Sequence, residues 1–360
     1  MMKDVYIFGA GIQGQIFLDV FKSLGLSVSG FIDDYAKSDT CNDLPALRVA
    51  DCQNKNADIY ISVGLISAKI KADLRALGFD HTYDFTQSVM KFPDIIHALK
   101  VHSLWYSDTP ADMVDAVAIA KFRTLLSDEK SQLLLDQIAA FRTDFSPEHY
   151  VMPDDNTQYF PGDIDVFAAI DRVRFVDAGA YNGDTVTSLM RNCNHQNIPF
   201  EYAACFEPDP KNLRALQNKV TELRYNGTQP HIFIYPAGAW NRSEALEFSA
   251  DQAASSRIAD RSTPQNTSET VFGLAIDDCV FSAAPNFIKM DIEGAEKNAL
   301  IGARETIISH RPVLAICLYH RPSDLWELPL FIHELVEDYD MYLRVYGDML
   351  LETVLYCLPK

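Results

Sequence analysis

The sequence predicts an α/β protein with two Rossmann-like sheets: a small one near the amino terminus, and a larger one of seven strands that closes with an antiparallel hairpin. Two stretches support this prediction, because residues 5–24 and residues 173–185 each read as a β-strand followed by a glycine-containing turn and the start of a helix. The third observation is the end of the chain, where residues 339–346 and 351–358 alternate as an antiparallel strand pair does.

Composition limits the partners. The 360 residues include 50 acidic and 31 basic side chains, and the net charge of −19 argues against a sequence-independent grip on nucleic acid or on an anionic membrane. No stretch reaches the roughly 18 apolar residues of a transmembrane segment. The seven cysteines show no paired spacing and no signal peptide precedes them, so we expect reduced thiols and a cytoplasmic protein.

The chain length predicts two domains. We expect a Rossmann-like nucleotide-binding-type domain over residues 1–90, a helical linker over residues 91–150 and the larger domain over residues 151–360. A stretch rich in proline, aspartate and tyrosine around Tyr159 and Phe160 has no clear period and reads as a long ordered loop. Such loops are often functional, and these aromatic rings could either close over a ligand or serve in packing.

The amino-terminal motif matches G-x-G-x-x-G. Gly9, Gly11 and Gly14 follow a predicted strand and open a predicted helix, and Asp33 ends the next strand about twenty residues later, where a ribose-binding carboxylate is expected. This spacing makes the region a second candidate nucleotide site. An inactive or repurposed fold is the alternative, because fewer than a hundred residues are short for a full dinucleotide site.

The central motif reads Asp-x-Gly-x-x-x-Gly. Asp177 ends a predicted strand, Gly179 and Gly183 form a turn, and Asp184 and Thr185 open a helix. Glycines let the backbone approach a ligand closely, and the amides of a helix start point into the crevice at the sheet edge. A purely structural turn is the alternative.

The next two predicted strands extend this crevice. Glu207, followed by Pro208, ends the second strand, where a carboxylate can accept both hydrogen bonds from a ribose diol. After the third strand, the small residues around Gly238, followed by Trp240, would admit a flat adenine ring. Residues 251–270 read as a polar loop, either a substrate lid or an insertion.

A further group of polar residues lies in the stretch 286–303. Asp291 ends a predicted strand, where it could take a proton from a hydroxyl or bind a divalent ion together with Glu293. Glu296 lies in the first helical turn, where the helix dipole favours negative charge, so helix stabilisation is its simplest interpretation. Lys289 could pair with either of these acids, Asp291 or Glu293, but its alternation with buried neighbours favours an exposed side chain.

His320 follows the fifth strand, on the same predicted sheet edge as Asp177, Glu207 and Asp291. An imidazole that titrates near neutrality is a natural base for a hydroxyl proton. A structural or solvated histidine is the alternative that the residue pattern leaves open.

Four blocks resemble, in order and spacing, the FkbM-type methyltransferases, whose hallmark is K-x-D-x-E-G-x-E: VDAGAYNGDT, FEPDPKNL, FIKMDIEGAEKNALIGA, and LYHRPSDLWELPLFI with YLRVYG. The resemblance covers about residues 155–360. It implies a class I methyltransferase fold, S-adenosylmethionine as methyl donor, and transfer to a hydroxyl oxygen, commonly on a sugar, glycan or polyketide.

The resemblance also implies a role for each matching residue. The acceptor would face Asp291, Glu293 and His320. The donor would contact Asp177, Gly179, Tyr181, Gly183, Asp184 and Thr185 with its methionine part, Glu207 and Pro208 with its ribose, and the backbone near Gly238 and Trp240 with its adenine. The chain departs from many class I enzymes in having no acidic residue after the third strand to hold the adenine amino group.

The amino-terminal domain resembles the nucleotide-sugar-binding module that precedes some sugar-modifying transferases. The resemblance implies that it holds the acceptor as a nucleotide-linked sugar or recruits a partner enzyme. A homo-oligomer is compatible with the sequence.

We therefore expect in-line methyl transfer, with His320 as base and Asp291 orienting it or the acceptor. A divalent ion on Asp291 and Glu293 is the rival arrangement. Two different functions stay open beside methyl transfer. One is that of an oxidoreductase centred on the amino-terminal glycines, which lacks a recognisable catalytic partner in the first 150 residues, and the second is that of a non-catalytic protein that only binds the donor.

Overall fold

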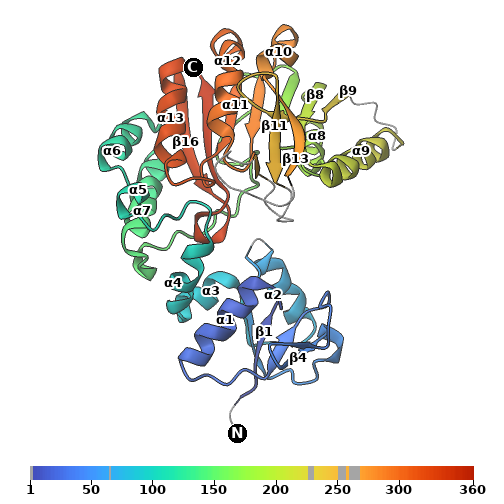
Figure 1. The fold of residues 1–360 in the computed structure, drawn as a ribbon, viewed down its shortest axis with the longest axis vertical. Coiled ribbons are helices and arrows are strands. Elements are labelled where there is room, and N and C mark those ends of the chain that lie inside the picture. The colour runs from blue at the N-terminus through green and yellow to red at the C-terminus, as the bar shows by residue number, and fades with distance from the viewer. Residues whose placement is uncertain (1–2, 65, 226–230, 250–256, 259–267) are drawn as a thin grey trace. The chain divides into compact units, whose positions relative to one another are not determined.

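The computed structural model describes residues 3–64, 66–225, 231–249, 257–258 and 268–360. The chain divides into two compact units, and each unit is built from three separate segments of the sequence (Figure 1). Unit 1 consists of Met1–Met113, Asp136–Asp154 and Gly347–Leu351, and unit 2 consists of Val114–Leu135, Asp155–Tyr346 and Glu352–Lys360.

Unit 1 contains a six-stranded sheet with the order β3-β4-β2-β1-β5-β6. Its strands are β1 (Val5–Phe8), β2 (Gly30–Ile32), β3 (Thr40–Cys41), β4 (Leu44–Leu47), β5 (Asp58–Ile61) and β6 (Thr82–Tyr83). The neighbours from β4 to β6 are parallel, and β3 pairs antiparallel with β4. This order is the Rossmann-like arrangement that the amino-terminal strand, turn and helix predicted.

The helices of unit 1 bury aromatic side chains against this sheet. They are α1 (Ile12–Ser23), α2 (Ser67–Ala76), α3 (Phe85–Lys91), α4 (Asp94–Leu99) and α5 (Pro110–Met113), and α7 (Glu129–Asp144) continues from unit 2 into unit 1. On α1, Phe17 and Phe21 have no exposed surface. Their ring centroids lie 5.7 Å from Phe85 and 5.2 Å from Tyr60, respectively.

The segment Gly347–Leu351 completes unit 1, although it comes from near the end of the chain. The Asp348 carboxylate accepts hydrogen bonds from Thr86 Oγ1 and Tyr150 Oη, both at 2.7 Å. The fully buried indole of Trp105 donates to the carbonyl oxygen of Met349 at 2.8 Å. The core of unit 1 therefore depends on residues from three parts of the sequence.

Unit 2 contains a seven-stranded sheet with the order β16-β17-β15-β14-β7-β8-β9. Its strands are β7 (Val173–Ala178), β8 (Phe200–Phe206), β9 (His231–Tyr235), β14 (Phe287–Met290), β15 (Val313–Cys317), β16 (Tyr339–Val345) and β17 (Thr353–Pro359). The strands β9, β8, β7, β14 and β15 pair in parallel, and β17 pairs antiparallel with both β15 and β16. The predicted α/β fold class, with its closing hairpin, is confirmed.

Unit 2 also contains a four-stranded sheet, formed by β10 (Gly238–Ala239), β11 (Glu244–Ser249), β12 (Arg257–Ile258) and β13 (Ser268–Leu274). The polar loop expected over residues 251–270 lies largely outside the described residues. Where it is described, the loop prediction is wrong, because residues 257–258 and 268–270 are in strands. The backbone of residues 268–273 pairs antiparallel with β11.

The helices of unit 2 flank its large sheet. They are α6 (Ala116–Leu125), α8 (Asp184–Gln196), α9 (Pro210–Tyr225), α10 (Ile276–Val280), α11 (Glu296–Gly302), α12 (Arg304–His310) and α13 (Asp324–Leu335), with the first part of α7. Figure 1 shows α11 and α13 running side by side in front of the sheet. Among the described residues, no helix is both long and apolar enough to cross a lipid bilayer.

The central strand β14 is buried along its whole length, including Lys289, whose residue surface is only 2% exposed. The expectation of an exposed Lys289 is therefore wrong. A parallel strand in the middle of an α/β sheet is covered on both faces, so alternation does not bring every second side chain to solvent.

Candidate functional site

The turn between β7 and α8, residues 179–183, needs glycine at both ends. Gly179 has a φ of +81°, and a Cβ built on it would lie 1.9 Å from the carbonyl oxygen of Asp291. Gly183 has a φ of +84° and is the N-cap of α8. Because Gly179 has no side chain, the backbone of this glycine turn comes close to the loop after β14.

Asp177 lies below the glycine turn, without exposed surface. Its Oδ1 atom is 3.1 Å from Nζ of Lys289, which is its register partner on β14. Nζ of Lys289 also donates to the carbonyl oxygen of Gly179 at 2.7 Å. In this structure Asp177 can therefore act on a ligand through Lys289 and the turn, and it has no surface for direct contact.

The two pKa shifts of this ion pair have different causes. Burial raises the pKa of Asp177 to about 6 even though Lys289 opposes the shift. Burial lowers the pKa of Lys289, but the carboxylates of Asp177 and Asp291 outweigh it and raise that pKa. The shifts differ because Asp177 faces one cation whereas Lys289 lies near two anions. Since the pKa of Asp177 stays below 7 and the pKa of Lys289 is raised, both groups are charged at pH 7.

Glu207 joins the glycine turn to the end of β8. Its Oε2 atom accepts the backbone amide of Tyr181, and its Oε1 atom accepts the amide of Asp209, both at 2.8 Å. Burial raises the pKa of Glu207 to about 7, against the effect of these two amides. Each carboxylate oxygen keeps a second lone pair for a ligand hydroxyl beside the turn.

The remaining residues of the first two motifs surround this point. Tyr181 has a φ of +47° and a residue surface that is 49% exposed. Asp184 begins α8, and its side chain accepts the amide of Thr185 at 2.7 Å. Pro208 is partly buried next to Glu207. The structure thus brings the turn and the end of β8 together, with the ring of Tyr181 exposed.

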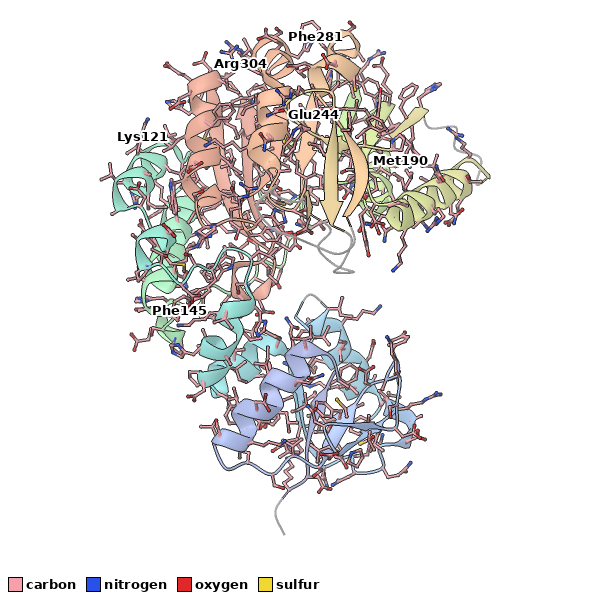
Figure 2. The ribbon with its side chains drawn as sticks, in the orientation of Figure 1. Lys121, Phe145, Met190, Glu244, Phe281 and Arg304 are labelled. Carbon is pink, nitrogen blue, oxygen red and sulfur yellow. The ribbon has the colours of Figure 1, made fainter. Side chains whose placement is uncertain are left out.

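Gly238 and Trp240 lie at the edge of the second sheet. Gly238 is in β10 beside Gly273 of β13, and the backbone amide of Trp240 donates to the carbonyl oxygen of Leu274 at 2.8 Å. The Trp240 indole donates to Glu244 at 3.0 Å, a residue labelled in Figure 2. The amide and indole donors of Trp240 are thus already engaged within the protein.

The second group of candidate residues meets around His320, and we call Asp291, Glu293, Glu296 and His320 the histidine cluster. Nε2 of His320 lies 3.3 Å from Oδ1 of Asp291 and 3.8 Å from Oε2 of Glu293. Nδ1 lies 2.9 Å from Oε1 of Glu296. Glu296 is only 1% exposed, so its role extends beyond the surface helix stabilisation that the sequence suggested.

Two features of His320 differ from the sequence expectation. Its side chain has no exposed surface, whereas those of Asp291 and Glu293 are 24% and 25% exposed. Burial lowers the pKa of His320, but Glu296 and Asp291 outweigh it and raise the pKa well above its ordinary value. The expected near-neutral imidazole is therefore wrong, because the neighbouring carboxylates favour the protonated ring, and His320 lies behind Asp291 and Glu293 as a buried cation.

Two tyrosine hydroxyls also contact the carboxylate of Asp291. Tyr159 Oη donates to Oδ2 at 2.8 Å, and Tyr319 Oη lies 3.2 Å from Oδ1 and 3.3 Å from Oε1 of Glu352. Gln158 donates to the second oxygen of Glu352. Burial and the charge of Asp291 raise the pKa of Glu352 to about 7. Sequence reasoning missed Glu352 because nothing in its local pattern connects it with Asp291.

The donor set does not fit a divalent ion well. Asp291, Cys317 and Glu352 each offer a ligand atom, and these atoms lie within 4.8 Å of one another. However, burial raises the pKa of the Cys317 thiol well above its usual range, and a metal ligand must be a thiolate. The carboxylates are already bonded to Tyr159, Tyr319 and Gln158. This group includes Asp291 but not Glu293, so among the described residues the expected pairing of Asp291 with Glu293 as metal ligands does not recur.

The glycine motif of unit 1 repeats the arrangement at Glu207. Asp33 follows β2, and its Oδ2 atom accepts the amide of Ala10 at 2.9 Å while Oδ1 accepts the amide of Tyr35 at 2.8 Å. Gly9 has a φ of +99°, and a Cβ on Gly14 would lie 1.9 Å from the Gly9 carbonyl oxygen. These contacts bring the predicted second nucleotide-site residues together at one sheet edge of unit 1.

Comparisons with known proteins agree with this fold. The family model of the methyltransferase FkbM domain matches residues 177–348. The crystal structure of methyltransferase FkbM from Methylobacillus flagellatus KT is similar to this chain, with a TM-score of 0.62 and 24% sequence identity over 99% of this chain and 90% of that one. This likeness shows a shared fold. No curated protein shows significant similarity to the chain.

The domain match begins at Asp177 and includes Glu207, the histidine cluster and Tyr319. It therefore covers both groups of polar residues that the seven-stranded sheet brings to its carboxyl edge. Residues 177–348 thus match the FkbM methyltransferase domain, which confirms the family that the sequence motifs predicted.

Proposed function

We propose that this methyltransferase is an S-adenosylmethionine-dependent O-methyltransferase that acts on a hydroxyl of a sugar, a glycan or a related small molecule. The observation that carries the proposal is the position of Glu207, whose carboxylate receives the Tyr181 amide from the neighbouring glycine turn. A ribose diol and a glycine-cradled methionine group would both fit around this contact. S-adenosylmethionine supplies a methyl group activated by the positive charge of its sulfonium.

The donor residues divide into those that touch and those that support. The backbone of Gly179 and Gly183, the ring of Tyr181 and the carboxylate of Glu207 would contact the donor. Asp177, Asp184 and Thr185 would shape the turn from below and from the start of α8. We place the adenine near Pro208 and Gly238. Trp240 would form an apolar wall beside it, because the amide and indole donors of Trp240 are already engaged within the protein.

The histidine cluster would handle the acceptor. Asp291 and Glu293 are partly exposed, and His320 lies behind them. We therefore propose that one of these two carboxylates, rather than the imidazole, accepts the proton of the acceptor hydroxyl. His320 would stabilise the two neighbouring carboxylates with its positive charge. This order reverses the roles expected from the sequence, because the imidazole has no exposed surface.

The cellular setting is part of the proposal. All seven cysteines are free thiols, which suits a reducing cytoplasm. As a second candidate role, unit 1 would bind a nucleotide-linked sugar, since Asp33 and the loop after β1 repeat the contact made by Glu207.

Calorimetric titration with S-adenosylmethionine tests the donor assignment. We expect binding to the parent chain and a loss of at least about tenfold in affinity for Tyr181→Ala, because removing the exposed ring removes stacking area without touching the core. Glu207→Ala should weaken binding further, since it removes a bidentate acceptor and frees two backbone amides.

Tyr35→Ala is the matched control, because Tyr35 is also an exposed tyrosine next to a nucleotide-type turn, but in unit 1. It should leave donor affinity unchanged. Absence of donor binding to the folded parent chain, or equal affinity in all variants, would contradict the donor site.

A further inference from the structure

The contact between Glu296 and His320 has no role in the mechanism above. The first residue of α11, Glu296, is only 1% exposed. Its Oε1 atom accepts the backbone amide of Ile292 at 2.8 Å and also lies 2.9 Å from Nδ1 of His320. One carboxylate oxygen thus accepts a hydrogen bond from the loop that carries Asp291 and lies within ion-pair distance of the ring that faces it.

The loop itself is shaped around this contact. Glu293 and Gly294 both have positive φ angles, of 56° and 90°. A Cβ on Gly294 would lie 2.9 Å from Nε of Arg321, the residue after His320. The Glu293 carboxylate lies near Nε2 of His320. Glu296, three residues later, accepts the backbone amide of Ile292 and so connects the two ends of the loop. The two ring nitrogens therefore face acids on opposite sides.

We propose that Glu296 is a positioning residue for methyl transfer: its carboxylate holds Nδ1 of His320, so that Nε2 is presented to Asp291 and Glu293. The inference rests on the proposed function, because it assumes that those two carboxylates meet the acceptor. A buried carboxylate beside one imidazole nitrogen fixes the orientation of the ring and keeps a proton on that nitrogen.

The charge of Glu296 also matters, because several ionisable groups act on the ring. These groups are Asp291 and Glu293 from the loop after β14, Glu296 from α11, Tyr319 beside the ring, Asp324 from α13, and Glu352 before β17. Lys289 and Arg321 are the cations that act on Asp291 and Asp324. Among the acids, Glu296 makes the shortest contact with the ring, so its loss should have the largest effect.

Nitrogen-15 NMR of histidine-labelled protein tests the proposal without donor or acceptor. The sequence has nine histidines, and the signal of His320 is the one missing from His320→Gln. In the parent chain we expect a proton on Nδ1 at pH 7 and a titration midpoint well above that of an exposed histidine. In Glu296→Gln the amide oxygen can still accept from Ile292, but the midpoint should fall by about one pH unit or more.

Glu305→Gln is the matched control, because Glu305 also lies in the first turn of a helix but has a side chain that is 62% exposed. It should leave the midpoint unchanged, which separates the Nδ1 contact from a general helix effect. Glu296→Asp keeps the charge and should restore part of the midpoint.

Activity supplies the second readout. With labelled S-adenosylmethionine and an acceptor that the parent methylates, Glu296→Gln should lower kcat by about tenfold and move its pH profile, while donor affinity by calorimetry stays unchanged. A fall in donor affinity with unchanged kcat would contradict positioning of the acceptor side.

Two results would overturn the inference. One is an unchanged His320 midpoint in folded Glu296→Gln. The other is a parent ring without a proton on Nδ1 at pH 7, a measurement that also decides the question if the variant does not fold. Neither result needs methyl transfer, whereas failure of the parent to bind S-adenosylmethionine would contradict the proposed function and leave the role of Glu296 in the ring geometry standing.

Discussion

At the scale of single residues, the most consequential contact is the buried ion pair of Asp177 and Lys289. Neither side chain has more than 3% exposure, and Lys289 also holds the carbonyl oxygen of Gly179. Burying two charges is costly, and the pair recovers that cost only while both partners are present. The glycine turn is thus held from below by an interaction that contributes geometry more than stability.

We predict that Lys289→Met destabilises the protein by about 3–5 kcal/mol, because it leaves the Asp177 carboxylate buried without a partner. The control Lys297→Met removes a surface pair with Glu327 and should cost about 0–1 kcal/mol. Urea unfolding measures both, and equal losses would contradict this explanation.

The pH dependence of the same variant has a definite sign. Burial already raises the pKa of Asp177 to about 6 with Lys289 present, so without Lys289 the pKa rises further. Protonation removes the buried charge. The deficit of Lys289→Met relative to the parent chain should therefore shrink as the pH falls from 8 toward 5.

The same pair shows what single residues reveal in a sequence and what they conceal. Asp177 at a strand end and the glycines after it are recognisable because strand, turn and helix follow one another locally. The burial of Lys289 is not, because it follows from the register between β14 and β7, strands separated by more than a hundred residues. The burial of Glu296 is hidden for a related reason: its partner, His320, lies on another strand connection.

At the scale of elements, the two glycine turns differ in what requires each glycine. In unit 1, Gly14 must be glycine because a Cβ there would lie 1.9 Å from a backbone oxygen. Gly11 has a φ of −75°, and among the described residues nothing lies within 4 Å of a Cβ built on it. The fold therefore explains Gly14 and leaves the missing side chain of Gly11 to another cause, such as a ligand that approaches the backbone.

We predict that Gly11→Leu keeps the thermal unfolding midpoint of the parent chain, whereas Gly14→Ala lowers it, because only Gly14 is crowded. If unit 1 binds a nucleotide at this turn, Gly11→Leu should also abolish binding of UDP-glucose or NAD measured by calorimetry. Binding that survives Gly11→Leu would place any nucleotide elsewhere, and loss of stability in that variant would contradict the open position.

Element boundaries are predictable where periodicity is strong. The strands that end at Phe8, Ala178, Phe206 and Met290 agree closely with the sequence expectation, since each is a short apolar run before a turn. The strand Ser268–Leu274 is only partly predictable, because its polar first residues look like loop. Their strand conformation comes from pairing with β11, a contact that local sequence does not encode.

At the scale of the whole molecule, the chain passes between its two units several times. A boundary at residue 151, as the sequence pattern suggests, would separate residues 128 and 131 from the strand they support. Arg344 is only 2% exposed, and it pairs with Asp128 and Asp163 at 2.9 Å each. Ser131 Oγ accepts the amide of Leu343 at 2.8 Å. These contacts all lie within unit 2.

We therefore predict that the fragment 151–360 does not fold with the stability of the full chain. It retains Arg344 as a buried cation with only one of its two carboxylates, and losing a partner of a buried charge costs about 3–5 kcal/mol. It also retains Asp348 and Met349, buried in the intact protein, without their partners Thr86 and Trp105. The fragment 114–360 is the informative comparison, because it restores Asp128 and Ser131 but still lacks Trp105 and Thr86.

Circular dichroism during heating should rank the full chain above 114–360 and both above 151–360. A fragment 151–360 that unfolds at the midpoint of the full chain would show that the seven-stranded sheet needs neither segment, and would restore the simple boundary.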